Sequence, residues 1–176
     1  MMTRGMAILH FVSGKAGSGK TTLARQIAQR ERAVLICEDE WMSRLAGPIE
    51  NLQQYLAAAA RLRSVIAPLT VDLLQLGTSV IFDFAGNTVR DREWVRSLFQ
   101  SAKAGHRLHY LRTDDATCKA RVRQRNESKP EGVFFGVVTE AQVDEVNRFF
   151  APPGGEEGFT VVVHDAGWRA AGPAGG

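Results

Sequence analysis

The sequence has few cysteines, no long hydrophobic run and little excess of charge of either sign. Its two cysteines, Cys37 and Cys118, lie far apart in the chain, so nothing indicates a disulfide framework and a reducing compartment suits the protein. The apolar run near the start, residues 7–12, is too short for a signal-peptide core or a membrane span. We therefore expect a cytoplasmic protein without a membrane partner. A net charge of +3 is too small to argue by itself for nucleic-acid binding.

Apolar residues are plentiful by contrast. They make up 44% of the 176 residues, which is enough for one domain with a sizeable core. We expect this single domain to span residues 1–169. Residues 170–176 contain only Gly, Ala and Pro and are expected to form a disordered tail.

Short β-branched runs alternate along the chain with longer segments of helical spacing, which is typical of an α/β fold with a mainly parallel sheet. The runs expected to be strands, each buried on both faces, are residues 7–13, 33–37, 79–84, 106–111 and 159–164. Helical periodicity covers 52–76, with Pro68 as a kink or a break, and recurs near 94–102, 118–122 and 143–150. The expected architecture is a three-layer sandwich around a five-stranded, mainly parallel sheet.

A phosphate-binding pattern, G-x-x-x-x-G-K-[ST], lies where the first strand meets the first helix. Glycines let the backbone point its N–H groups at phosphates, and the start of the helix offers the positive end of its dipole. The lysine reaches the β/γ-phosphates, and the threonine hydroxyl can ligate Mg²⁺. The alternative, a chance Gly/Ser turn, is disfavoured by the strand before and the helix after. The expected ligands are ATP and Mg²⁺, held by Gly14, Lys15, Ala16, Gly17, Ser18, Gly19, Lys20, Thr21 and Thr22.

Two acids follow expected strands. Asp83 closes the apolar run Val80-Ile81-Phe82, as a Walker B acid does, and could hold Mg²⁺ together with Thr21. Its alternative role is an ordinary strand-end Asp that caps a turn. Asp39 follows the second strand and should face the phosphate end of the nucleotide, because ligands of parallel sheets collect at the carboxyl ends of strands. Glu38 and Glu40 flank it, and a solvated acidic turn or helix cap is the alternative for all three.

A group of arginines borders a segment that lacks a clear period, residues 126–138. Arg121 and Arg125 are four residues apart and share a helix face, which leaves them free if Cys118 and Val122 face the core. We interpret residues 121–138 as a lid that closes these arginines on the γ-phosphate. The alternative is a solvated basic face. Asn87, near the start of the helix after Asp83, either caps that helix or binds a substrate hydroxyl.

The histidines carry little signal. His106 and His109 should point to opposite faces of a strand, and no zinc-ligand spacing involves them. His10 and His164 are expected to be packed or edge residues.

These motifs together resemble those of the small bacterial P-loop kinases of the polynucleotide-kinase, zeta-toxin, chloramphenicol-phosphotransferase and gluconokinase group, over roughly residues 7–125. The resemblance implies that Asp39 is the base that activates an acceptor hydroxyl. It implies that Asp83, Asn87 and Arg92 shape the acceptor site. It also implies that Arg121 and Arg125 belong to the lid helix. Lys20, Asp39, Arg121 and Arg125 are then the expected catalytic residues.

The resemblance leaves the acceptor open. Ala85-Gly86 departs from the tighter Asp-x-Thr-Asn pattern of the nucleic-acid kinases, which disfavours a polynucleotide and favours a small molecule or a nucleotide. The rival functions are an ATPase or switch protein, a zeta-type toxin kinase and a nucleoside-monophosphate kinase. The chain lacks the Asn-Lys-x-Asp motif of base-reading GTPases. A regulatory partner protein stays open from the sequence.

Overall fold

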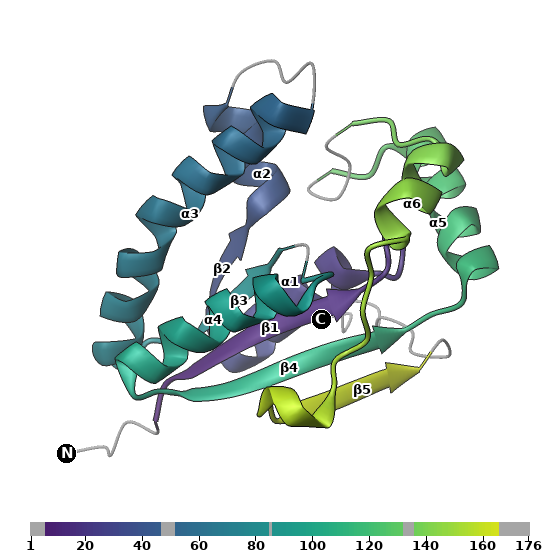
Figure 1. The fold of residues 1–176 in the computed structure, drawn as a ribbon. Helices are drawn as coiled ribbons and strands as arrows, with labels where there is room; N and C mark the ends of the chain where they lie inside the picture. Colours follow the sequence, from purple (N-terminus) through teal and green to yellow (C-terminus); the bar gives the residue numbers. More distant parts are fainter. Residues whose placement is uncertain (1–5, 47–51, 85, 132–135, 166–176) are drawn as a thin grey trace, which may run out of the picture.

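Five strands form one parallel sheet in the order β2-β3-β1-β4-β5 (Figure 1). The structure is a computed structural model that describes residues 6–46, 52–84, 86–131 and 136–165. The strands are β1 (Ile8–Gly14), β2 (Val34–Cys37), β3 (Val80–Asp83), β4 (Gly105–Arg112) and β5 (Val161–Asp165). The helices are α1 (Lys20–Glu31), α2 (Glu38–Leu45), α3 (Leu52–Gln75), α4 (Val89–Ala102), α5 (Asp115–Ser128) and α6 (Glu140–Asn147), with a 3₁₀ turn at Gly155–Glu157.

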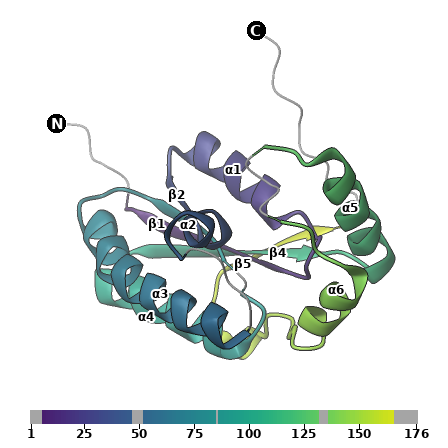
Figure 2. The same cartoon turned by 90° about the horizontal axis from the view of Figure 1, so that it is seen from above.

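Alternation of side chains along β1 builds two cores, one on each face of the sheet. Leu9 and Phe11 belong to the larger core, with residues of α3 and α4. Val12 faces the other way and packs with Leu23 and Ile27 of α1. Figure 2 shows the resulting layers, with α1 on one side of the sheet and α3 and α4 on the other. The predicted three-layer α/β sandwich is confirmed, and all of the described strand pairs are parallel.

The helix starts follow local capping chemistry. Thr88 caps α4 through a reciprocal pair with Asp91, and Thr139 caps α6 in the same way with Gln142. Asp114 caps α5 by accepting a hydrogen bond from the Thr117 N–H. These caps fix where α4 and α5 begin after the C-terminal ends of β3 and β4, and where α6 begins after α5. Figure 1 shows α2 and α3 on one side of that edge of the sheet and α5 and α6 on the other.

Residues 38–45 form α2, a helix that no periodicity in the sequence predicted. Two expectations about the elements need correction. Pro68 lies inside α3 and does not divide it. The strands at the two edges of the sheet are not buried on both faces: Val34 of β2 is 40% exposed and Val163 of β5 is 49% exposed. An edge strand has a neighbour on one side only, which leaves it more open to solvent.

Parts of two predictions concern residues that the structure does not describe. The predicted tail, 170–176, lies outside the described residues, as do residues 132–135 of the predicted lid loop. In the part of the chain that the structure describes, no helix is both long and apolar enough to cross a membrane.

Candidate active site

The phosphate loop joins β1 to α1, as the motif predicted. Gly17 and Gly19 adopt positive φ angles of 82° and 104°, which L-residues with side chains adopt rarely. A β-carbon at Gly17 would also collide with the carbonyl oxygen of Cys118 on α5. The loop is closed by a hydrogen bond from the Ser18 N–H to the Lys15 carbonyl (3.1 Å). Glycine is therefore needed at position 17 both for the turn and for the close approach of α5.

Lys20 is the first residue of α1, and its ammonium lies folded back onto the loop. Its Nζ donates to the carbonyl oxygens of Gly14 (2.8 Å) and Lys15 (2.9 Å). Burial lowers the pKa of Lys20, while the carboxylates of Asp83 and Asp39 act in the opposite direction. The ammonium, Asp83 and Asp39 therefore lie within electrostatic reach of one another, although they come from three separate elements.

The loop also contains a buried hydroxyl group, that of Ser18. The Ser18 hydroxyl is buried and has no hydrogen-bond partner among the described residues. A buried hydroxyl without a partner is costly, and nearly all such groups in folded proteins are satisfied. An anion seated on the loop can supply the missing acceptor, so the cradle fits a phosphate group on its own geometry.

Asp83 ends β3 and is almost completely buried, with 8% of the residue exposed. Its Oδ2 accepts a weak hydrogen bond from the Cys37 thiol (3.4 Å). Thr21 and Thr22, the second and third residues of α1, are half-buried. A carboxylate, a hydroxyl and nucleotide oxygens form the hard donor set that Mg²⁺ prefers. The side chains of Asp83 and Thr21 thus have the chemistry that the predicted metal-binding role needs. The position of Asp83 beside Lys20 also agrees with that role.

The structure separates the three consecutive acids at the start of α2. Glu38 is buried and accepts from the Arg63 guanidinium at 3.2 Å. Glu40 pairs with Arg44 at 2.9 Å on the protein surface. Asp39 forms no ion pair with any residue that the structure describes. Of the three carboxylates, Asp39 alone is free to contact a substrate.

Asp39 is exposed, yet neighbouring residues still shift the pKa of its carboxyl. Loss of hydration by nearby protein atoms raises the pKa of Asp39, and the Asp83 carboxylate raises it further. Lys20 and Arg125 lower it in turn. The residues around Asp39 are therefore those of the phosphate site, which includes one arginine from α5.

The arginines of α5 have different partners. Arg121 donates to the Ser18 carbonyl oxygen at 2.7 Å, so it already lies against the phosphate loop. Arg125 lies near Asp39 and Lys20, and its buried Nε has no hydrogen-bond partner among the described residues. Arg123 points away and pairs with Glu140 of α6. Arg121 and Arg125 thus share a face toward the site, as their spacing predicted, while Arg123 does not.

Further contacts hold α5 and α6 against the phosphate loop. Lys15 forms an ion pair with Asp115 of α5 (2.8 Å), and the Ala16 N–H donates to Oδ1 of Asn147 in α6 (2.9 Å). At the base of the predicted lid loop, the Asn126 side chain exchanges two hydrogen bonds with the backbone of Val138 (2.8 and 3.3 Å). Nothing in the local sequence around Asn147 marked it, because its contact joins segments far apart in the chain.

Arg92, which we expected to contact the acceptor, is instead completely buried. Its Nε and Nη2 donate to the two carboxylate oxygens of Glu157 at 2.6 and 2.8 Å. Its Nη1 donates to the carbonyl oxygens of Gly86 (3.2 Å) and Ala151 (2.8 Å). This corrects the expectation, because the donors of Arg92 bind the segment before β5 to the loop after β3 and leave none for a substrate.

Asn87 keeps its candidate role. Its side chain is buried, with 8% of the residue exposed, and its Oδ1 has no hydrogen-bond partner among the described residues. Its backbone carbonyl accepts from the Ala151 N–H at 2.8 Å. Helix capping, the alternative for Asn87, is done by its neighbour Thr88.

The AAA_33 family, described as an AAA domain, matches residues 9–153. The chain belongs to this family. No curated protein matches it in sequence. Among solved structures, it is similar to a putative kinase from Chloroflexus aurantiacus J-10-fl, with a TM-score of 0.71 and 19% identity over 91% of this chain and 85% of that one. It is also similar to a gluconokinase from Sinorhizobium meliloti 1021, with a TM-score of 0.63 and 18% identity over 94% of this chain and 86% of that one.

A third similar structure is Kti12 from Chaetomium thermophilum in complex with ADP-AlF3, with a TM-score of 0.66 and 14% identity over 89% of this chain and 88% of that one. These similarities show the fold of P-loop kinases. The predicted resemblance to the small P-loop kinases is confirmed at the level of family and fold.

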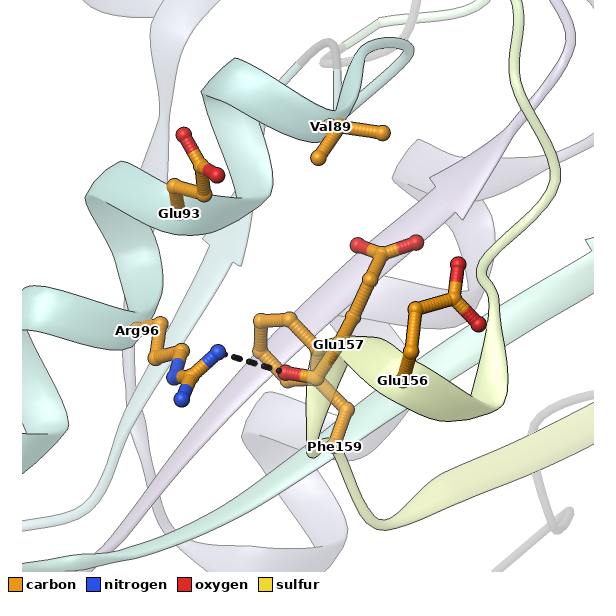
Figure 3. Close-up of a pocket in the computed structure, with 6 residues that line it drawn as sticks. All are labelled: Val89, Glu93, Arg96, Glu156, Glu157 and Phe159. Atoms are coloured by element: carbon orange, nitrogen blue, oxygen red, sulfur yellow. Dashed lines mark hydrogen bonds between the residues drawn. The ribbon is translucent and has the colours of Figure 1, made fainter.

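A separate pocket of about 150 Å³ lies between α4 and the segment before β5 (Figure 3). It contains neither the phosphate loop nor Asp39, and Arg96 closes one side of it by donating to the Glu157 carbonyl at 3.2 Å. We therefore do not assign the nucleotide or its acceptor to this pocket. Its lining residues are Val89, Glu93, Arg96, Glu156, Glu157 and Phe159.

Proposed function

We propose that this chain is an ATP-dependent kinase that transfers the γ-phosphoryl group to a hydroxyl of a small molecule or a nucleotide. One observation carries the proposal: Lys20, Asp83, Asp39 and Arg125, from four separate elements, act electrostatically on one another at the phosphate loop. A phosphoryl-transfer site needs a cation on the phosphates, a carboxylate for the metal, a group that accepts the hydroxyl proton and an arginine for the developing charge. The four residues match these needs one for one.

Each residue has a defined part in the proposed reaction. The loop N–H groups and Lys20 hold the β- and γ-phosphates. The oxygen of the acceptor hydroxyl bonds to the γ-phosphorus, and the bond from that phosphorus to the bridging oxygen of ADP breaks. Asp39 accepts the proton that the hydroxyl loses. Arg125 neutralises charge on the transferred group. Asp83 and Thr21 would hold Mg²⁺, which supplies charge neutralisation between the phosphates when it is bound.

The structural relatives support a kinase over a switch protein. The gluconokinase from Sinorhizobium meliloti and the putative kinase from Chloroflexus aurantiacus share the fold over most of both chains. The carboxylate of Asp39 has no ion-pair partner among the described residues, so it is available to accept the proton of an acceptor hydroxyl. A zeta-type toxin kinase would use the same phosphoryl-transfer chemistry.

Label transfer tests the proposal directly. The protein is incubated with γ-labelled ATP, Mg²⁺ and a panel of sugars, amino alcohols, nucleosides and nucleotides, and labelled acceptor is separated from labelled inorganic phosphate. We expect one acceptor class to be labelled above the rate of release to water, and Lys20→Met to abolish this transfer with the fold intact by circular dichroism. Release to water alone, across the whole panel, would instead identify an ATPase.

A further inference from the structure

Arg63, which belongs to no sequence motif, connects three helices next to the proposed base Asp39. Arg63 of α3 donates through Nε to Glu38 (3.2 Å) and through Nη1 to Asp91 of α4 (2.9 Å). Its guanidinium also lies over the Trp94 and Phe84 rings, at 5.1 and 5.9 Å from their centroids. Arg63 thereby connects the start of α2, the middle of α3 and the first turn of α4.

Because Glu38 directly precedes Asp39, this cluster adjoins the carboxylate that would receive the acceptor. Tyr55 of α3 lies in the same surroundings: burial raises the pKa of its phenol, and the charges of Glu38 and Asp39 raise it further. We refer to Glu38, Arg63, Asp91 and Tyr55 as the acceptor wall. Its four residues belong to α2, α3 and α4, the helices labelled in Figure 1.

The only cation among the four residues of the acceptor wall, Arg63, is already paired. Arg63 is shared between two carboxylates, one of which, Glu38, is only 3% exposed at its side chain. If Arg63 turned to an acidic substrate, it would break its ion pairs with the buried Glu38 carboxylate and with Asp91, which is strongly unfavourable. Arg44, the surface arginine at the end of α2, is bound to Glu40. The cations that act on Asp39 are Lys20 and Arg125, which belong to the phosphate side.

Two residues that adjoin the wall in the sequence, Asp39 and Asn87, offer acceptors of hydrogen bonds. Asp39 is unpaired among the described residues, and the buried Oδ1 of Asn87 has no partner there either. Asn87 directly precedes Thr88, whose capping partner Asp91 binds Arg63. Carboxylate and amide oxygens are satisfied by hydroxyl or ammonium donors and not by an anion.

From this arrangement we infer the charge class of the acceptor: an alcohol without an anionic group, with a cationic amino alcohol favoured over a neutral one. The inference rests on the proposed kinase function and names the substrate class of the same site. An acidic sugar or a nucleoside monophosphate would meet excess carboxylate at the acceptor wall, whose one cation, Arg63, is already paired.

Acceptor series that share a hydroxyl scaffold and differ in charge test the inference. Glucosamine, glucose and gluconate form one series, and ethanolamine, ethylene glycol and glycolate form another, with adenosine against AMP as a third comparison. The measured quantity is label transfer from γ-labelled ATP, expressed as kcat/KM for each acceptor. We expect kcat/KM to fall by about tenfold or more from the amine to the acid of a scaffold that is used.

A matched pair of variants on α4 separates the acceptor wall from general charge effects. Asp91→Asn removes a carboxylate of the wall and should reduce the ratio of kcat/KM for the amine to that for the acid. Glu93→Gln removes a carboxylate from the same helix at the separate pocket of Figure 3 and should leave the ratio unchanged. Thermal unfolding of both variants checks that α4 is intact.

The outcomes distinguish the two proposals. Preferred transfer to gluconate, glycolate or AMP keeps the kinase function and overturns the charge class. Equal shifts of the ratio in Asp91→Asn and Glu93→Gln also overturn it, because the acceptor wall would then have no special effect. Release of phosphate to water with every acceptor overturns the kinase function, and the charge class with it.

Discussion

Asp39 differs from its acidic neighbours in having no ion-pair partner among the described residues. We expect Asp39→Asn to lower kcat for phosphoryl transfer by about 10²–10⁴-fold, the usual contribution of a positioned base, with little change in ATP affinity. Glu40→Gln is the matched control, since Glu40 pairs with Arg44 on the surface. Steady-state kinetics with a labelled acceptor measure both. If Asp39→Asn transfers phosphate at the wild-type rate, the hydroxyl is activated by another group.

Glu38, although it is adjacent to Asp39, is not a suitable control for that comparison. Because it is buried and bound to Arg63, Glu38→Gln would perturb the packing of α2 against α3 as well as any chemistry. The difference between Glu38 and Asp39 depends on which way α2 turns, and two adjacent acids in a sequence carry no signal for that.

Arg125 and Arg123 provide a second comparison at the scale of single residues. Arg125 lies at the phosphate site with a buried Nε without a partner among the described residues, whereas Arg123 pairs with Glu140. We expect Arg125→Met to lower kcat by about 10³-fold and to change KM for ATP much less, because its charge matters most in the transition state. Arg123→Met should leave both constants nearly unchanged. Equal losses in the two variants would mean that α5 contributes only a general basic field.

At the scale of elements, the buried pair of Arg92 and Glu157 fastens the segment before β5 to α4. Although burial by itself would raise the pKa of Glu157, hydrogen bonds from Arg92 and from the Gly154 N–H lower it overall. We expect Arg92→Met to reduce the free energy of unfolding by about 3–5 kcal/mol, since it leaves a buried carboxylate without its partner. Denaturant titration measures this change.

The double variant Arg92→Met with Glu157→Leu tests the cause of that loss. It removes both charges and should be more stable than Arg92→Met alone. ATP affinity, measured by calorimetry on the folded variants, should stay near wild type. A large loss of ATP affinity in a variant that is still folded would return Arg92 to the functional site.

The parts of the fold that followed from the sequence are those with local signals. The phosphate loop combines a strand, spaced glycines and a helix start within a few residues, so it was predictable from the motif. Arg92 was misassigned because its partner, Glu157, lies far along the chain. Arg63 was missed for the same reason: its meaning depends on Glu38 and Asp91 from two other helices. The roles of Arg92 and Arg63 are determined by partners that lie far apart in the sequence. The periodicity of a sequence gives no information about such pairs.

At the scale of the whole molecule, three strands share a chain of imidazoles. His109 of β4 lies between His10 of β1 and His164 of β5, with ring nitrogens 3.1 Å apart at both contacts. The sequence placed His109 on the face opposite His106, which is confirmed: His106 stacks on Phe99 in the other layer. It did not reveal the chain, which depends on the register of β1, β4 and β5.

Burial lowers the pKa of His10 to about 4 and that of His109 to about 3. Around them, Arg30 and Arg107 lower the pKa of His10 further, while Glu31 raises it. Above about pH 7.5 both histidines are neutral in the folded and the unfolded chain and add no pH dependence. Below that pH the unfolded chain binds protons that the folded chain does not. The folded state therefore loses stability as pH falls from 6.5 toward 4.

We expect His10→Gln to flatten the pH dependence of the free energy of unfolding between pH 6.5 and 4. The contribution of His10 over this range is on the order of 3 kcal/mol, because each pKa unit corresponds to about 1.4 kcal/mol. Urea titrations at several pH values measure the slope, and His106→Gln on the opposite face serves as the control. Identical slopes for His10→Gln and the wild type would mean that other groups cause the acid sensitivity.

The central position of β1 has a consequence for how the protein is made. Leu9 of β1 is flanked by Val80 of β3 and His106 of β4. On the ribosome, the strand that leads into the phosphate loop is therefore synthesised first but has no sheet neighbour until residue 80 has emerged, and no second one until β4 follows. The first strand of the nucleotide site therefore has both of its sheet neighbours only after β4, residues 105–112, has been synthesised.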